Sequence, residues 1–136
     1  MPQRARKGKQ RAVVDTSVPV AGIAGFREPY LHGKNPSADL LHEWGEEENF
    51  AWLYSEDILD ERRLRVRPNV IGKVINLIRE RAGVVKVRST AEISPDPKDD
   101  PFCLCAEDGD ADFIFILNPR DFPQDRLKAK VALPKN

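Results

Sequence analysis

The sequence predicts an α/β fold in which a central parallel sheet of four or five strands lies between two layers of helices. Short apolar segments rich in β-branched or aromatic residues recur along the 136 residues, and stretches of helical periodicity separate them. This alternation favours parallel strands, because each parallel connection must cross the sheet and usually does so as a helix. The length is typical of one domain with one core.

The first elements are two strands separated by a helix. Residues 11–15 are a β-branched apolar run that ends on an acid, which is typical of a buried strand. Pro36 opens a helix over 36–46, with Ser37 as the expected cap. The aromatic run at 50–54 predicts the second strand.

The middle of the chain predicts two more helices and a third strand. Residues 55–61 begin a helix with acids in its first turn, where the helix dipole favours them. Residues 70–82 carry their apolar side chains on one face of a helix that Gly83 ends. The valine-rich residues 84–87 predict the next strand.

The last third predicts a helix and two strands. Residues 100–108 form the helix, with Pro101 in its first turn and Gly109 after its end. The apolar run 112–117 predicts a buried strand, and 130–133 predict an edge strand.

Charge is balanced overall, with 22 basic and 22 acidic residues, but segregated along the chain. Residues 43–61 hold eight acids and no base, whereas 62–88 hold nine bases and one acid. The zero net charge excludes a polycation that coats nucleic acid, so any contact with nucleic acid must come from a local patch. These blocks are also compatible with ordinary solvated faces joined by salt bridges.

Domain limits and location follow from the ends and the apolar runs. Residues 1–11 form a basic N-terminal arm, and 12–136 are expected to form one domain. No apolar run reaches the roughly 20 residues of a membrane span, and no secretory signal follows the basic start. We therefore expect a cytoplasmic protein without membrane contact.

Cys103 and Cys105 are too few for a disulfide scaffold and indicate no zinc site. We expect one core thiol and one partly exposed thiol.

Four acids fall where the carboxyl ends of parallel strands would place them. Asp15 follows the first strand, Glu61 lies in the helix after the second, Asp99 precedes a later helix, and Asp121 follows the last core strand. Ligand sites of open parallel sheets lie at this edge. Because clustered carboxylates repel one another, such a group favours a bound cation, and hard oxygen ligands suit Mg2+ or Mn2+.

Four short motifs follow one another along the chain, at residues 13–17, 55–61, 96–102 and 118–123. In this order they resemble the motifs of the PIN-domain ribonucleases. Residues 13–17, Val-Val-Asp-Thr-Ser, are similar to the opening strand and acidic signature of that family. Residues 55–61 resemble its second motif, a serine and then a helix with a glutamate. Residues 96–102 are similar to its third motif, and 118–123 to its fourth. The resemblance covers nearly the whole domain and is nearest in pattern to the toxins of bacterial or archaeal toxin–antitoxin pairs.

The resemblance implies a metal-dependent endoribonuclease of three-layer α/β/α architecture. It implies Asp15 and Asp99 as metal ligands and Glu61 as a further ligand or a base toward the attacking water. Ser17 would support the carboxylates or the water shell, and Asn118 or Asp121 would complete the site. The metal would neutralise charge on the phosphate and lower the pKa of its water.

The same resemblance implies the partners. The substrate would be RNA, with phosphate contacts from basic residues beside the acidic site, namely Arg63, Arg65, Arg67 and Lys73. A cognate antitoxin protein and a homodimer are also expected.

A second interpretation is a catalytically weakened PIN-type module that binds RNA or a protein. Ile116 and Leu117 stand where the family usually carries a hydroxyl residue, and only a short segment separates Glu61 from Pro68. In a purely structural interpretation, Asp15 would cap a turn and Asp99 would cap the helix that follows it.

Overall fold

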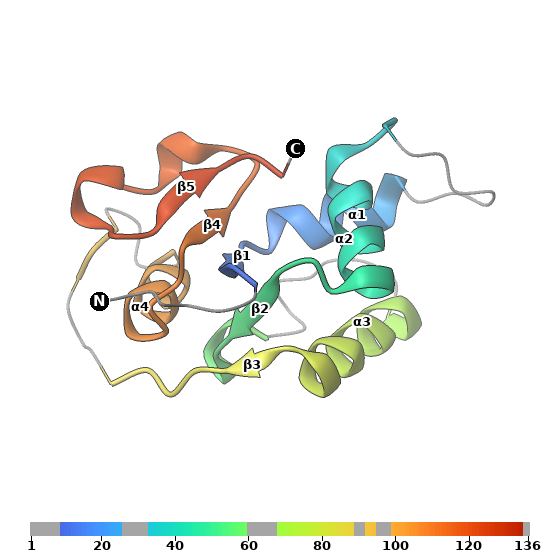
Figure 1. Cartoon of the computed structure of the whole chain (residues 1–136), viewed down its shortest axis with the longest axis horizontal. Helices are drawn as coiled ribbons and strands as arrows, with labels where there is room; N and C mark the ends of the chain where they lie inside the picture. Colours follow the sequence, from blue (N-terminus) through green and yellow to red (C-terminus); the bar gives the residue numbers. More distant parts are fainter. Residues whose placement is uncertain (1–8, 26–32, 60–67, 89–91, 95–98, 135–136) are drawn as a thin grey trace.

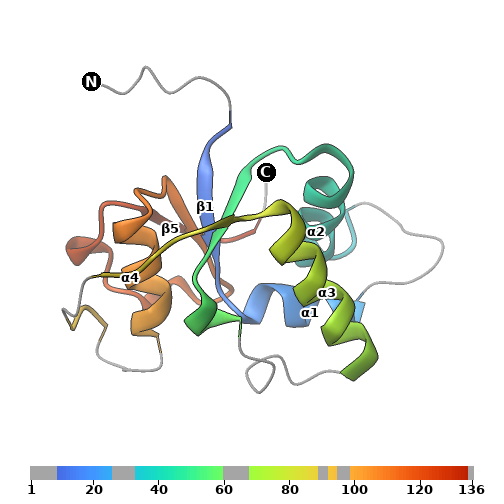
Figure 2. The ribbon, with the colours of Figure 1, turned by 90° about the horizontal axis from the view of Figure 1, so that it is seen from below.

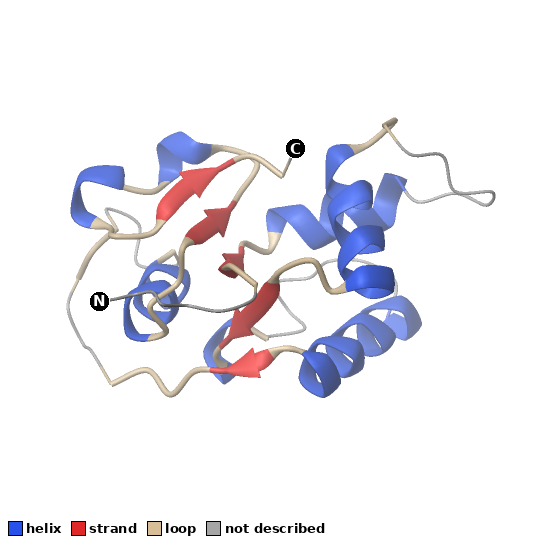
Figure 3. Cartoon of the chain, in the orientation of Figure 1, coloured by secondary structure: helices blue, strands red, loops and turns tan. Residues whose placement is uncertain are grey.

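The structure is a computed structural model that describes residues 9–25, 33–59, 68–88, 92–94 and 99–134. Its centre is a five-stranded sheet in the order β3-β2-β1-β4-β5, in which every neighbouring pair is parallel (Figures 1 and 3). The strands are β1 (Arg11–Val14), β2 (Ala51–Tyr54), β3 (Gly83–Val84), β4 (Phe113–Phe115) and β5 (Lys130–Ala132).

Helices cover both faces of this sheet. The helices are α1 (Ser17–Gly25), α2 (Pro36–Glu47), α3 (Pro68–Arg81) and α4 (Asp100–Asp108), with short 3-10 turns η1 (Glu56–Ile58), η3 (Pro119–Asp121) and η4 (Gln124–Arg126). Figure 2 shows α1, α2 and α3 on one side of the sheet and α4 on the other. The predicted three-layer α/β/α fold with a parallel sheet is confirmed.

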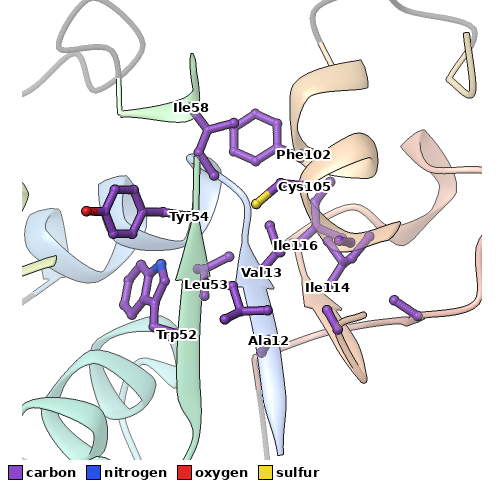
Figure 4. Packing of buried hydrophobic residues seen from close by; sticks show 14 of the residues in the cluster. Ala12, Val13, Trp52, Leu53, Tyr54, Ile58, Phe102, Cys105, Ile114 and Ile116 are labelled. Atoms are coloured by element: carbon purple, nitrogen blue, oxygen red, sulfur yellow. The ribbon is translucent and has the colours of Figure 1, made fainter. Parts of the chain in front are cut away.

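One part of the core lies between the sheet and α4. Val13 pairs with Leu53 on one side and Ile114 on the other, so these three side chains share one sheet face. Phe102 and Cys105 of α4 reach toward this face (Figure 4). Val13, Ile114 and Cys105 are fully buried, which ties the central strands to α4.

The opposite face of the sheet is aromatic. Trp52 and Tyr54 point away from α4 in Figure 4, as expected for residues that alternate with Leu53. The Trp44 ring of α2 packs on Trp52 with ring centroids 4.7 Å apart. This contact fixes α2 against the sheet.

The helix α1 is absent from the sequence prediction. Its sequence, SVPVAGIAG, is apolar on every side and therefore shows no helical periodicity. Gly22 explains why it forms where it does, because a Cβ there would lie 2.6 Å from Leu41 Cδ1 of α2. The close approach of the two helices thus buries an element that has no polar face of its own.

Four local predictions are corrected by the structure. The cap of α2 is Asn35 and not Ser37: the Asn35 side chain accepts from the N–H groups of Ser37 and Ala38, while Ser37 is buried inside the helix. The predicted helix at 55–61 begins instead as the single turn η1, and its remainder lies outside the described residues.

The other two corrections concern segment ends. The strand predicted at 84–87 is found at Gly83–Val84. One further bond runs from the Val85 N–H to the Tyr54 carbonyl. Arg11, counted above in the basic arm, is the first residue of β1, and residues 1–8 of the arm lie outside the described residues. None of the helices in the described ranges is both long and apolar enough to cross a membrane.

Candidate active site

The strand order creates a switch point between β1 and β4. The strands β2 and β3 lie on one side of β1, and β4 and β5 lie on the other. Loops that leave neighbouring carboxyl ends in opposite directions open a crevice at this edge, which is where open α/β sheets bind ligands. The segments that meet there are those after β1 and β4, and α4 begins at the same edge (Figure 2).

Asp15 lies at this switch point, directly after β1. Its backbone N–H donates to the Phe115 carbonyl at 2.8 Å, which extends the β1–β4 pairing by one residue. Its side chain is 8% exposed, and one carboxylate oxygen accepts the Ser17 N–H at 2.9 Å. In the described part of the chain, no Lys or Arg forms an ion pair with Asp15. A buried carboxylate without a cation is costly, so this position favours an external positive charge.

Ser17 joins the two central strands at their carboxyl ends. It is the first residue of α1, and its Oγ accepts the backbone N–H of Leu117 at 3.3 Å. Leu117 follows β4 by two residues and is itself exposed. The hydroxyl of Ser17 therefore lies at the end of β4, close to where Ile116 and Leu117 supply no hydroxyl of their own.

Asp99 immediately precedes α4, as the sequence predicts. Its carbonyl accepts the N–H groups of Phe102 and Cys103, which begins the helix, while its side chain makes no capping bond. The capping role that the purely structural interpretation gives this side chain is therefore not found. The neighbouring Asp100 carboxylate has a structural task instead, because it accepts the N–H groups of Ile93 and Ser94 at 3.1 and 2.7 Å.

The thiol of Cys103 lies within electrostatic range of both Asp15 and Asp99. Burial is the main reason that the pKa of Cys103 rises to about 12, and nearby carboxylates raise it further. These include Asp100 and Asp99 from the start of α4 and Asp15 from β1. Negative charges from two distant segments thus act on one side chain.

This arrangement fits part of a divalent-metal site. Mg2+ characteristically uses one or two protein carboxylates and completes its shell with water and substrate phosphate. Asp15 supplies a buried carboxylate, and Asp99, directly before α4, supplies a second carboxylate that acts on the same thiol. Within the described residues, no group of three or more His, Cys, Asp and Glu side chains is close enough to hold a metal ion.

The predicted fourth corner is more exposed than the rest of the site. Asn118 and Asp121 both lie at the surface beyond β4, where Asn118 Nδ2 donates to Asp121 Oδ1 at 3.1 Å. The two residues therefore lie together at this corner, whereas the sequence offered Asn118 and Asp121 as alternatives. Asp121 ends the turn η3.

The remaining predicted residues are placed only in part. Glu61 and the cations Arg63, Arg65 and Arg67 lie outside the described residues. Lys73 is exposed on α3. Their roles in catalysis and RNA binding remain predictions.

Two features of this region are not predicted from the sequence. Cys103 and Cys105 are both fully buried, so the expectation of one partly exposed thiol is wrong. Ser55 is buried directly after β2, and its Oγ has no oxygen or nitrogen partner among the described residues. Its place in the second motif is the signal that could have identified it.

Comparison with known proteins identifies the family. A profile described as "PIN domain" matches residues 11–118, most of the chain and all of β1 to β4. No curated protein and no solved structure matches the chain. PIN domains are generally nucleases that act on nucleic acids, and they typically use divalent metal ions. The matched profile and the parallel sheet with Asp15 at its switch point agree, and the chain belongs to the PIN domain family.

Proposed function

We propose that the chain is an Mg2+- or Mn2+-dependent endoribonuclease with Asp15 and Asp99 at its centre. The observation that carries this proposal is the buried Asp15 carboxylate, which has no described cationic partner and shares the Cys103 environment with Asp99. A divalent ion between the two would remove the cost of burying this charge. Asn118 and Asp121 would lie at the rim of the same site.

The bound metal would supply a polarised phosphate and a water of lowered pKa. Asp15 and Asp99 would hold it, and the Ser17 N–H would fix the orientation of the Asp15 carboxylate through the 2.9 Å bond. Glu61 would act as a further ligand or accept a proton from water. Arg63, Arg65, Arg67 and Lys73 would contact RNA phosphates.

The biological setting that we propose is a cytoplasmic toxin that forms a homodimer and that a cognate antitoxin holds inactive. Membership of the PIN domain family supports this setting. The antitoxin would need to cover or distort the carboxylate pair.

A PIN-type module that binds without cutting is the second candidate. The observation in its favour is that the end of β4 is apolar, with Ile116 buried in the core and Leu117 exposed. The Ser17 hydroxyl lies beside this strand end and compensates in part, but it is already engaged by the Leu117 N–H.

The proposal is tested by incubating the full chain with a generic single-stranded RNA in Mg2+, in Mn2+ and in EDTA. Wild type should cleave only with metal, and Asp15→Asn should lower the rate by about 100-fold or more, because the amide keeps the acceptor for Ser17 but loses the charge. Asp125→Asn is the matched control, since Asp125 is exposed on η4 and should leave cleavage unchanged.

Thermal shift with Mn2+ separates the two candidates. A wild-type melting temperature that rises with Mn2+, and an Asp15→Asn protein that does not respond, would place the ion at the carboxylate pair. RNA binding without cleavage in any metal would favour the binding module. Metal-dependent cleavage that Asp15→Asn retains would contradict the site itself.

A further inference from the structure

The two edges of the sheet differ in what covers their backbone. The strand β5 forms one edge and β3 forms the other (Figure 1). At β5 the Val131 N–H donates to Gln124 Oε1, and Gln124 Nε2 donates to the Ala129 carbonyl, both at 2.8 Å. This side chain occupies backbone groups with which a further strand would pair. Among the described residues, no side chain bonds the backbone of β3 in this way.

The outer side of β3 presents backbone donors and acceptors. The Val85 N–H donates to the Tyr54 carbonyl of β2 at 2.7 Å. Because successive residues of a strand direct their backbone groups to alternate sides, the N–H and C=O groups of Val84 and Lys86 face away from β2. Figure 1 shows β3 as the outermost strand on that side of the sheet. We call residues 83–88 the β3 edge.

The side chains of the β3 edge alternate between the core and the surface. Val85 and Val87 pack against the core. Val84 is 60% exposed, and Lys86 and Arg88 are exposed as well. A repeat of two residues is typical of an extended chain. One face of the β3 edge is therefore fixed against the core, and its other face carries an apolar side chain followed by two cations.

A pocket of about 340 Å³ adjoins the β3 edge at the amino ends of the strands. Val84 lines it, together with the buried side chains of Trp44 and Trp52. Its charged lining residues are three cations and one acid, namely Lys9, Arg11, Arg81 and Glu48. Within the described residues, none of these four takes part in an ion pair. The surroundings of Val84 are therefore cationic as well as apolar, which favours an acidic occupant.

We propose that the β3 edge binds an extended acidic segment of a partner protein, which pairs with β3 as a further strand of the sheet. The backbone of this segment would bond the outward groups of Val84 and Lys86, as in other cases of strand addition. Its acidic side chains, at alternate positions, would face Lys86 and Arg88, because opposite charges stabilise cross-strand pairs. An apolar side chain would cover Val84. The inference does not rest on the nuclease proposal, since the β3 edge contains none of the residues of that site.

Two other occupants fit the β3 edge less well. A polypeptide supplies N–H and C=O groups at the spacing of a strand, whereas an RNA backbone does not. A second copy of this chain would bring Lys86 and Arg88 close to the same cations of its partner, and like charges across strands are destabilising. Exposed cations are one means by which edge strands avoid such self-association.

The test measures binding of a fluorescent peptide, Thr-Val-Thr-Glu-Val-Glu-Thr, to the full chain by anisotropy at low salt and in EDTA. When extended, this peptide places its first valine and both glutamates on one face. A second peptide carries glutamine at both glutamate positions, which keeps the shape and removes the charge. Two further peptides are N-methylated, one at the first glutamate and one at the second valine. These block N–H groups that point to opposite sides of an extended chain.

Variants of the chain address the cations and the backbone separately. Lys86→Gln/Arg88→Gln removes both charges and keeps long side chains. Lys128→Gln/Lys130→Gln is the matched control, because it removes two exposed cations, also two residues apart, at the opposite edge of the sheet. Val84→Pro removes an outward N–H without removing a bond to β2. Circular dichroism and melting curves establish that each variant is folded.

The glutamate peptide should bind wild type and the Lys128/Lys130 variant alike, and the Lys86/Arg88 variant about fivefold more weakly or worse. The glutamine peptide should show the same loss on wild type. One N-methylated peptide should bind like its parent and the other more weakly, because only one side of the added strand pairs with β3. Val84→Pro should weaken binding by about threefold or more. If this variant does not fold, the two N-methylated peptides test the backbone bonds.

Several outcomes would overturn the proposal. Absence of binding to wild type at about 1 mM glutamate peptide would do so. Equal weakening by both double variants would indicate general attraction between opposite charges, and equal affinity of the two N-methylated peptides would exclude strand pairing. Displacement of the peptide by single-stranded RNA would assign the β3 edge to nucleic acid. A dimer by sedimentation that Val84→Pro dissociates would assign it to a second copy.

These results are separable from those on the nuclease. Lys86→Gln/Arg88→Gln leaves Asp15 and Asp99 untouched, so metal-dependent RNA cleavage by this variant should equal that of wild type. Loss of peptide binding with retained cleavage would support the β3 edge, and absence of nuclease activity in wild type would leave the peptide result standing.

Discussion

The backbone N–H of Leu117 donates to the Ser17 Oγ at 3.3 Å, and this bond joins the ends of β1 and β4 at the switch point of the sheet. Ser17 also donates its own N–H to the Asp15 carboxylate. One residue therefore fixes the buried acid and the strand end beside it. The arrangement couples the geometry of the candidate site to the first turn of α1.

Ser17→Ala removes the acceptor and tests this coupling. Leu117 is exposed, so water can replace the bond, and unfolding in urea should show a loss of only about 0.5–1.5 kcal/mol. The rate of RNA cleavage should fall by more than the loss of folding stability accounts for, because the end of β4 would no longer be held. Ser17→Thr retains the hydroxyl and should behave like wild type; equal cleavage by the alanine variant would show that the bond has no part in the site.

Asp99 and Asp100 are adjacent acids with different expected roles. Asp99→Asn should abolish the rise in melting temperature that Mn2+ produces, because it removes a ligand charge. Asp100→Ala should lower stability without metal by about 1–3 kcal/mol, because it removes the acceptor of the Ile93 and Ser94 N–H groups. Thermal melts with and without Mn2+ measure both effects, and a reversed pattern would exchange the two roles.

Alanine in place of Gly22 or Gly45 is expected to change folding stability in opposite directions. Gly22→Ala should destabilise by about 1–3 kcal/mol, because its Cβ would lie 2.6 Å from Leu41 Cδ1 and 3.0 Å from the Ser37 carbonyl oxygen. Gly45→Ala should stabilise by about 0.5–1 kcal/mol, because it lies in α2 with nothing within 4 Å of the added methyl group. Denaturant unfolding of both variants is the measurement; a neutral Gly22 variant would mean that α1 and α2 pack less closely.

The buried thiols predict a loss of stability at alkaline pH. Burial is the main cause that raises the pKa of Cys103 and of Cys105 from 9.0 to about 12. Unfolded thiols ionise near the ordinary value while folded ones stay protonated, so their contribution is present below pH 9.0 and is lost as pH rises toward about 12. Urea unfolding at successive pH values should show a shallower decline for Cys103→Ala/Cys105→Ala than for wild type.

Thiol labelling gives an independent check on the same burial. Ellman's reagent should not react with the native chain at pH 8 and should react with both thiols in denaturant, because neither sulfur is exposed in the fold. Rapid labelling of one thiol in the native state would restore the interpretation of a partly exposed cysteine.

The strands and their acids could be predicted because their signals are local. The apolar run that forms β1 is followed at once by Asp15, and the turn before Pro101 places Asp99 at the start of α4. These patterns are legible in a few consecutive residues. The helix α1 could not be predicted in this way, because it has no polar face and depends on Gly22 meeting α2.

By itself the sequence determined the alternation of strands and helices, the acids at the strand ends and the resemblance to the family. The tertiary structure alone decided that the charges of Asp15 and Asp99 both act on the Cys103 thiol and that Ser17 holds Leu117. The reason is physical: residue type and spacing set local conformation, whereas burial and contact between distant segments depend on how the layers pack.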